Sequence, residues 1–320
     1  MQVPSVVSNG RAGECAVVDL STSVGSVKLK APVLTASGTV GYGAEFARYL
    51  RPAELGAVVV KSMKATPWEG NPAPRVHPTP AGMINSVGLQ GSGVHHWLEH
   101  ELPDLEATGA AIVASIWGNT IDEYSKAADA LADAPSAVVA LEVNVSCPNL
   151  EDRSRMFAHS TSATSDAIEA TAGCGRPRWA KLSPNAPDIA EIAAAAHSAG
   201  AEAVVLTNTL LAMVIDPKTR RPVLGAKRGG LSGAAMRPVA VRAVYDVHEA
   251  ASGLPIVGVG GVTCGIDVVE YLLAGACAVQ VGTATFADPR APRRILSEFE
   301  QWCDRHEVER PGDLIGEAHG

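Results

Sequence analysis

The residues best suited to chemistry stand together at 144–149, where Asn-Val-Ser-Cys-Pro-Asn follows an apolar run at 137–143. A β-branched run that ends in polar residues is typical of a buried strand that delivers side chains into a site. Cys147 could act as a nucleophile or, as a thiolate, accept a proton. Asn144 and Asn149 could donate to and accept from a planar, amide-rich ligand. Taken alone, the same residues also fit a buried structural cysteine before a proline turn.

The elements that must position these residues alternate between short β-rich runs and alanine-rich helical segments. We expect strands at 32–36, 57–60, 111–116, 138–143, 178–182, 203–206, 256–259 and 278–281. We expect helices at 121–131, 165–172, 189–199, 238–251 and 268–274. Repeated strand–helix units predict a parallel sheet, and this number of strands favours an α/β fold closed as a (β/α)8 TIM barrel. A doubly wound open sheet is the alternative, although no Gly-x-Gly-x-x-Gly follows the first strand.

The domain organisation follows from an even composition. Without a linker-like change we expect one barrel domain at 15–310, with an N-terminal tail at 1–14 and a C-terminal tail at 311–320. A hairpin at 16–30 should precede the barrel and close its bottom. Long insertions at 62–93 and 210–233 follow strands on the C-terminal face, where barrel enzymes build their sites.

Composition excludes several classes of function. With 26 basic and 34 acidic residues in 320, the formal charge of −8 argues against a nucleic-acid partner or an anionic membrane surface. No run reaches the ~18 apolar residues of a membrane span, and the N-terminus lacks a signal-peptide pattern. Six single cysteines fit reduced thiols, so we expect a cytoplasmic protein. Without clustered cysteines, we expect no metal or iron–sulfur site built by this chain alone.

Polar or small residues follow most of the predicted strands, and a barrel would bring them to one face. They are Ser37, Lys61, Ser62, Asn144, Lys181, Asn208, Thr209, Gly260, Gly261, Gly282 and Thr283. The glycines after the last two strands favour a phosphate site made of backbone N–H groups, with plain turns as the alternative. Lys61 and Lys181 could balance an anionic ligand, form a Schiff base or pair with a buried carboxylate.

A series of motifs from Val17 to Ala287 carries a family resemblance. The motifs are Ala36–Thr39, Gly70–Arg75, Ile84–Gln90, Asn144–Asn149, Asn208–Leu210 and Gly229–Gly233. In this order they resemble the class 1 dihydroorotate dehydrogenases. The Asn-Thr-Leu-Leu-Ala-Met and Gly-Gly-Leu-Ser-Gly segments resemble most the 1B subclass, whose catalytic chain pairs with an electron-transfer subunit.

The resemblance implies an FMN-containing barrel that oxidises (S)-dihydroorotate to orotate in de novo pyrimidine (UMP) biosynthesis. Cys147 would be the base at C5 and the hydride at C6 would pass to N5 of FMN, with Lys61 serving both flavin and substrate. The implied substrate contacts are Lys61, Asn85, Ser86, Val87, Gly88, Leu89, Asn144, Asn149, Asn208 and Thr209. The implied FMN contacts are Ser37, Lys61, Ser62, Asn144, Lys181, Leu206, Gly233, Gly260, Gly261, Gly282 and Thr283.

The 1B resemblance also implies partners: a heterotetramer built on a dimer of this chain, with FAD and a [2Fe–2S] cluster on the second subunit and NAD as final acceptor. A homodimer that uses fumarate or oxygen is the alternative within the family. Outside it stand an FMN barrel acting on another pyrimidine, a Schiff-base aldolase using Lys61 or Lys181, and a non-catalytic scaffold.

The sequence departs from the family pattern at two places. The segment at 150–157 is charged where the 1B pattern has a glycine pair before Phe157, and this leaves the behaviour of a lid there open. Ser115 stands where the family often has a flavin-contacting Asn, so we assign no site role to it.

Overall fold

The computed structural model describes residues 18–149 and 155–320, without the side chains of Pro148, Asn149 and Arg155. Its central sheet is parallel and eight-stranded, in the order β3-β18-β17-β12-β11-β8-β7-β4. The strands are β3 (Val33–Thr35), β4 (Val58–Val59), β7 (Ile112–Ile116), β8 (Val138–Asn144), β11 (Arg178–Lys181), β12 (Ala203–Leu206), β17 (Ile256–Val259) and β18 (Ala278–Val281). The Gly56 amide donates to the Val33 carbonyl at 2.9 Å and links β3 to the start of β4. The predicted strands and the TIM-barrel fold are confirmed.

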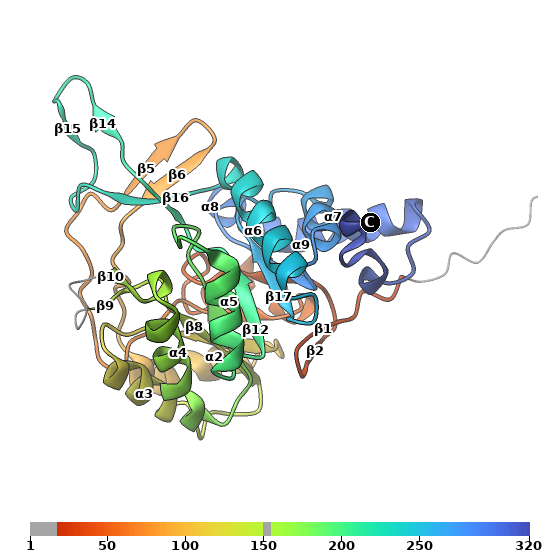
Figure 1. Cartoon of the computed structure of the whole chain (residues 1–320), viewed down its shortest axis with the longest axis horizontal. Helices are drawn as coiled ribbons and strands as arrows, with labels where there is room; N and C mark the ends of the chain where they lie inside the picture. Colours follow the sequence, from red (N-terminus) through yellow and green to blue (C-terminus); the bar gives the residue numbers. More distant parts are fainter. Residues whose placement is uncertain (1–17, 150–154) are drawn as a thin grey trace, which may run out of the picture.

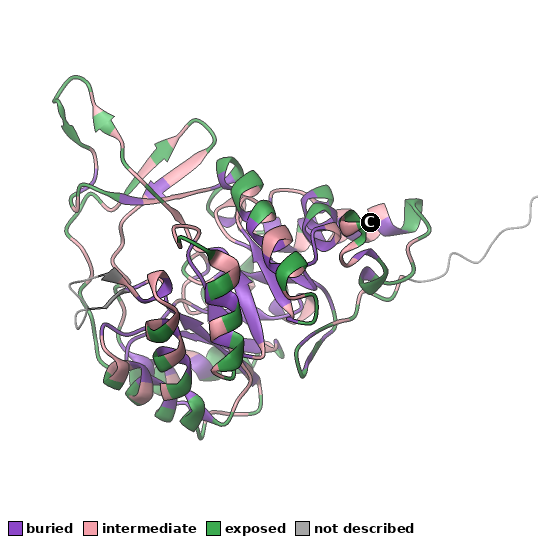
Figure 2. Ribbon diagram, viewed as in Figure 1, coloured by how far each residue is buried: buried purple, intermediate pink, exposed green. Residues whose placement is uncertain are grey.

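Helices surround the barrel, with their exposed faces outward and the strands buried inside (Figures 1 and 2). The predicted helices form, as α3 (Ile121–Asp129), α4 (Thr161–Ala170), α5 (Ile189–Ser198), α6 (Arg237–Ala250) and α7 (Gly265–Leu273). The other helices are α1 (Val94–His96), a π-helical turn at Trp97–Glu101, α2 (Leu102–Glu106), α8 (Ala284–Ala287) and α9 (Ala291–Arg305). The sequence analysis missed α9, which is rich in charge but buries an apolar stripe through Ile295, Phe299 and Cys303.

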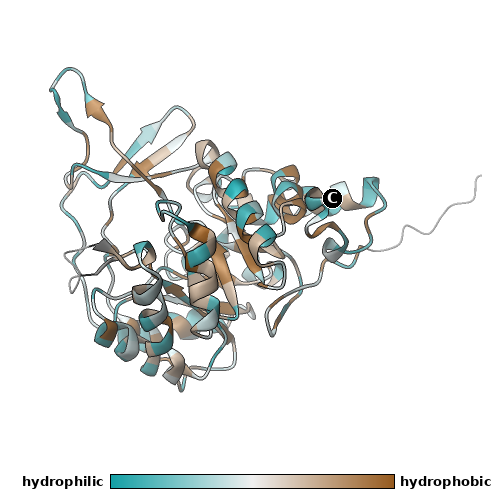
Figure 3. Cartoon of the chain, in the orientation of Figure 1, coloured by the Kyte–Doolittle hydropathy of each residue, from teal (hydrophilic) through white to brown (hydrophobic). Residues whose placement is uncertain are grey.

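The predicted hairpin before the barrel is also confirmed. Strands β1 (Thr22–Val24) and β2 (Val27–Leu29) pair antiparallel, and Thr22 Oγ1 donates to the Cys277 carbonyl at 2.8 Å, just before β18. Val24, Val27 and Leu29 join the apolar cluster that fills the barrel interior with Trp179. The hairpin therefore closes the N-terminal end of a hydrophobic barrel, and the barrel strands that are visible in Figure 3 are largely brown, that is, apolar.

The two insertions, expected as loops, instead contribute a second sheet on the opposite face. It is antiparallel in the order β13 (Leu210–Ala212), β16 (Gly229–Ser232), β6 (Gly82–Asn85) and β5 (Val76–Thr79). In its centre Asn85 pairs with Gly230, so residues far apart in sequence lie side by side. Two short strands, β14 (Ile215–Asp216) and β15 (Arg221–Pro222), project beyond it (Figure 1).

Smaller elements complete the described chain. Strands β9 (Pro148–Asn149) and β10 (Arg155–Met156) pair antiparallel. Residues 311–320, expected as a tail, form two 3-10 turns, and the Gly316 amide donates to the Leu272 carbonyl of α7 at 3.0 Å. The expected tail at 1–14 lies outside the described residues. Among the helices that are described, none has the length and apolarity needed to cross a membrane.

Candidate active site

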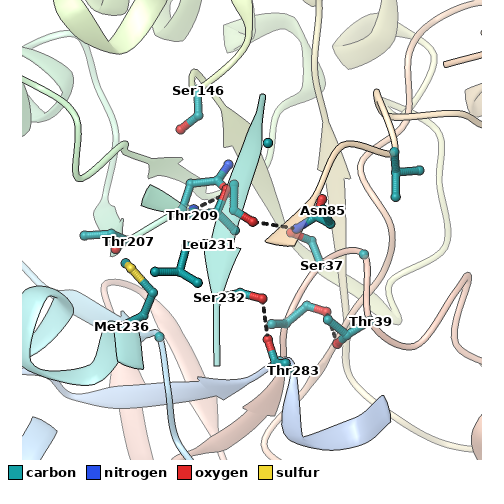
Figure 4. A pocket seen from close by; sticks show the side chains of 18 of the residues that line it. Ser37, Thr39, Asn85, Ser146, Thr207, Thr209, Leu231, Ser232, Met236 and Thr283 are labelled. Carbon is teal, nitrogen blue, oxygen red and sulfur yellow. Dashed lines mark hydrogen bonds between the residues drawn. The ribbon is translucent and has the colours of Figure 1, made fainter. Parts of the chain in front are cut away.

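A cavity of about 430 Å³ opens at the C-terminal ends of the barrel strands, with the second sheet forming part of its wall. It brings together nearly all the side chains that the sequence analysis selected. These are Ser37, Lys61, Ser62, Asn85, Ser86, Val87, Gly88, Leu89, Asn144, Cys147, Lys181, Asn208, Thr209, Gly233, Gly260, Gly261, Gly282 and Thr283. Figure 4 shows several of them around the cavity.

Two selected residues, Leu206 and Asn149, are not among the described residues that line the cavity. Leu206 is fully buried in the apolar cluster between the strands and the helices, and its neighbour Thr207 lines the cavity instead. Successive strand residues point to opposite faces, so a difference of one position exchanges the core for the cavity. The side chain of Asn149 and the segment 150–154, which includes most of the expected lid, lie outside the described part of the chain.

Cys147 lies directly beyond β8 and is almost fully buried, with 1% of its surface exposed. Its Sγ lies 3.6 Å from the Asn144 carbonyl, to which the Tyr124 hydroxyl also donates at 2.7 Å. Burial raises the pKa of the Cys147 thiol far above its ordinary value, although the Tyr124 hydroxyl acts in the opposite direction. The thiol is therefore protonated at neutral pH, and it gains base strength only as the pH rises.

Three asparagine side chains that line the same cavity are held in fixed orientations. Asn144 Oδ1 accepts from the Ser146 amide at 3.1 Å and from Asn208 Nδ2 at 3.2 Å. Asn208 Oδ1 in turn accepts from the Thr209 amide at 2.8 Å. Across the cavity, Asn85 Nδ2 donates to the Gly230 carbonyl at 3.3 Å. Side chains held in this way are suited to recognising a planar ligand with donors and acceptors on its edge.

The loop at 85–90 is braced by its neighbours from the same insertion. Trp68 Nε1 donates to the Gly88 carbonyl at 3.0 Å, and the Asn71 amide donates to the Val87 carbonyl at 3.0 Å. Asn71 Nδ2 also donates to Ser86 Oγ at 2.9 Å. The backbone N–H groups of this loop are thus held on a rigid segment beside the asparagines.

Lys61 brings a positive charge to the cavity lining. Burial, and secondarily the Arg75 guanidinium, lower the pKa of the Lys61 ammonium below its usual value. Lys61 lies just beyond β4, and its amide donates to the Gly41 carbonyl at 2.9 Å. A carboxylate or an enolate placed here would be stabilised by this charge.

Glycines form the wall at the ends of β17 and β18. Gly260 and Gly261 have φ of +139° and +71°, in the region that favours glycine. A Cβ on Gly261 would lie 2.8 Å from the backbone nitrogen of Arg237, so a side chain would collide with α6. Thr283 Oγ1 donates to Ser232 Oγ at 2.8 Å (Figure 4). The bare backbone and hydroxyls suit a phosphate group.

The structure adds residues that the sequence analysis did not select. Thr207 and Ser146 bring buried hydroxyl oxygens to the cavity, and neither oxygen has a partner among the described residues. Leu231 and Ser232 come from the second insertion, and Met236 comes from the 3-10 turn that precedes α6 (Figure 4). A signal for Ser146 was present, since it lies inside the 144–149 motif. A signal for Thr207 was present too, since it directly follows the predicted strand at 203–206. The placement of Leu231 and Ser232 depends on the pairing of β16 with β6, which no local pattern reveals.

Comparison with known proteins assigns the family. A family model described as dihydroorotate dehydrogenase matches residues 19–302. The catalytic subunit of dihydroorotate dehydrogenase B (NAD(+)) from Desulforudis audaxviator is 46% identical over 303 residues, covering 94% of this chain and 98% of that protein. The subunit of the same name from Geobacter sp. (strain M21) is 44% identical over 299 residues, with 93% and 97% covered. The chain belongs to the dihydroorotate dehydrogenase family.

Proposed function

We propose that this chain is the catalytic subunit of a flavin-dependent enzyme that oxidises (S)-dihydroorotate to orotate in the cytoplasm, for pyrimidine biosynthesis. The observation that carries the proposal is the placement of Cys147 and the asparagines in one cavity with the glycine wall. Family membership and the names of the relatives support the same reaction.

The cavity fits FMN on three counts. Its volume of about 430 Å³ lies in the range of cofactor and ligand pockets. The glycines at 260, 261 and 282 line the cavity at the ends of β17 and β18, where they would offer bare backbone to a phosphate. The buried Thr207 hydroxyl lacks a partner among the described residues, and a ring carbonyl or nitrogen would satisfy it. We therefore assign the flavin ring to the wall made by Ser37, Ser62, Lys181 and Thr207, and move the expected contact at Leu206 to Thr207.

FMN supplies a two-electron acceptor for the hydride from C6 of dihydroorotate. The residues of this chain do the rest. Asn85, Asn144, Asn208 and Thr209 bind the ring amides and the carboxylate, and a buried group left unpaired would cost about 1–3 kcal/mol. Cys147 as thiolate takes the C5 proton, so the C5–C6 double bond of orotate forms as one proton and one hydride leave. Lys61 stabilises the charge that develops on the substrate.

We further propose that the electrons leave through a second subunit that carries FAD and a [2Fe–2S] cluster, with NAD as final acceptor, in a heterotetramer built on a dimer of this chain. The relatives are named as catalytic subunits of NAD(+)-linked enzymes, and this supports a separate electron-transfer chain. Turnover of the isolated chain with fumarate would instead indicate a self-sufficient homodimer.

The deciding experiment is an anaerobic absorption spectrum of the purified chain before and after addition of dihydroorotate. We expect a yellow protein whose flavin absorbance bleaches with substrate. A yellow protein that bleaches with another dihydropyrimidine but not with dihydroorotate would overturn the substrate. A protein that stays colourless after addition of FMN would overturn the flavin site, and borohydride trapping at Lys61 or Lys181 would then test for a Schiff base.

A further inference from the structure

A buried polar network lies directly beneath the cavity, and its centre is not part of the cavity wall. Its centre is the Glu142 carboxylate, which is fully buried inside the barrel. Glu142 and Asn144 are two residues apart on β8, so they point to the same face, with Asn144 in the cavity and Glu142 one layer below. A buried carboxylate is costly unless partners surround it.

The partners of Glu142 come from three other barrel strands. Oε1 accepts from Ser115 Oγ at 3.0 Å and lies 3.5 Å from Lys181 Nζ. Oε2 accepts from Gln280 Nε2 at 2.8 Å. Gln280 Oε1 accepts from the same Lys181 ammonium at 3.3 Å, so the amide is locked between the two charges. Each oxygen of Glu142 therefore has a partner.

The network reaches the cavity wall at two points. Lys181 Nζ donates to Ser37 Oγ at 3.0 Å, and Ser115 Oγ lies 2.8 Å from Ser62 Oγ. Lys181, Ser37 and Ser62 line the cavity, whereas Glu142 does not. The positive end of the ion pair thus faces the cavity, and the negative end lies behind it.

We propose that Glu142 is a positioning residue that holds Lys181 at the cavity wall, partly neutralises its charge, and thereby lowers the reduction potential of the bound flavin. The inference rests on the proposed flavin site. Two-electron reduction leaves negative charge on a flavin ring, so a cation beside the ring favours the reduced form, and a carboxylate behind that cation weakens the effect. Ser37 and Ser62 connect the network to the cavity lining through their contacts with Lys181 and Ser115.

The test is the midpoint potential of the flavin bound to the full chain, measured by anaerobic dye equilibration, together with flavin affinity of the apoprotein. E142Q keeps the shape but removes the charge, and it should raise the potential. A charge within about 4–6 Å shifts a protonation equilibrium by about 1–3 units. Because Glu142 lies one layer behind Lys181, we expect the lower end of this range, about a tenfold shift toward reduced flavin, which is about 30 mV for a two-electron couple.

Further variants separate electrostatics from a merely structural role. E142Q/K181Q removes both charges and should have a lower midpoint potential than the wild type, because the lost cation is nearer to the cavity. K181Q should have a lower potential still. The double variant also stands if E142Q does not fold, since removal of a whole buried pair is tolerated better than removal of one partner. The matched control is E123Q. Glu123 Oε1 lies 2.8 Å from the ammonium of the buried Lys64, and neither residue lines the cavity.

The outcomes distinguish this inference from the proposed function. The inference is supported if the midpoint potential rises in the order K181Q, E142Q/K181Q, wild type and E142Q, and if E123Q has the potential of the wild type. If the wild type binds flavin but the redox equilibrium constant of E142Q stays within twofold of the wild-type value, the inference alone is overturned. A double variant whose midpoint potential equals or exceeds that of the wild type also overturns it. A wild type that binds no flavin overturns the proposed function, and the inference with it.

Discussion

The contact between the two insertions offers a sharp test of the substrate site through Gly230. In β16, Gly230 pairs with Asn85 and packs against Thr209. A Cβ at this position would lie 2.5 Å from Thr209 Cβ and closer still to its Oγ1. Its φ lies outside the left-handed region, so the effect of G230A is steric. Because a Cβ is not the end of a flexible chain, rotation of Thr209 cannot relieve the overlap.

The size of the effect follows from the overlap. Non-bonded carbon atoms prefer about 3.5–4.0 Å, so residue 209 or strand β16 must move by about 1 Å. A misplacement of about 1 Å near a reacting group can cost about 100-fold in rate. We expect G230A to lower kcat/KM for dihydroorotate by about 100-fold, or about 2.7 kcal/mol of transition-state stabilisation.

The assay is steady-state oxidation of dihydroorotate with an artificial electron acceptor, together with titration of FMN into the apoprotein. FMN affinity should stay close to wild type, because the expected phosphate site lies at Gly260 and Gly282. G253A is the matched control, since a Cβ at this exposed position meets nothing within 4 Å. A G230A enzyme whose kcat/KM stays within threefold of the control would refute the assignment of Thr209 to the substrate.

Three further predictions concern the thiols and the core. Because burial raises the pKa of Cys147, the rate of flavin reduction should rise with pH, and C147S should slow it by orders of magnitude with FMN still bound; a profile flat from about pH 6 to 10 would contradict the role of base. Burial raises the pKa of Cys277 from 9.0 to about 11, so this neutral thiol stabilises the fold fully below pH 9 and the contribution is lost as the pH rises to 11. Between pH 9 and 11, the unfolding free energy measured in urea should fall by about 2–3 kcal/mol more in the wild type than in C277A. An equal dependence of the unfolding free energy on pH in the two proteins would contradict this prediction. F299A, which empties a fully buried site between α9 and the barrel, should lower the unfolding free energy by about 3–5 kcal/mol in urea; a loss below about 1 kcal/mol would contradict the packing.

The barrel was predictable because most of its strands are short, largely apolar runs bounded by turn residues. Parallel strands that are buried on both sides do not need alternating apolar and polar residues. The length and β-branched content of each run were therefore sufficient to predict it as a strand. The same uniformity explains why the prediction selected Leu206, whereas Thr207 lines the cavity. A run that is apolar on both faces does not reveal which residue points inward, so the cavity contact was placed one position away from Thr207.

The second sheet and the buried network were not predictable from local patterns. β16 is made of Gly229–Ser232, a segment with little strand propensity, and it exists because it pairs with β6. Glu142 sits in an apolar run and gives no sign of its partners, which come from distant strands. The residues at strand ends were identified because strand ends converge in a barrel. Asn85 and its neighbours came from the family resemblance, whereas Leu231 and Ser232, which depend on the pairing of β16 with β6, were missed.

The pairing of β6 with β16 has a consequence for how the protein is made. Asn85 and Gly230 are separated by 145 positions. Strand β3 can pair only after β18 has been synthesised, because Thr35 pairs with Val281. The chain must therefore be nearly complete before either half of the cavity can close, and contacts this distant in sequence form slowly. During synthesis the early strands remain without their final neighbours. A ligand that bridges both halves would shift the equilibrium toward the closed form, so pyrimidine precursor and cofactor supply would also govern how much finished protein accumulates.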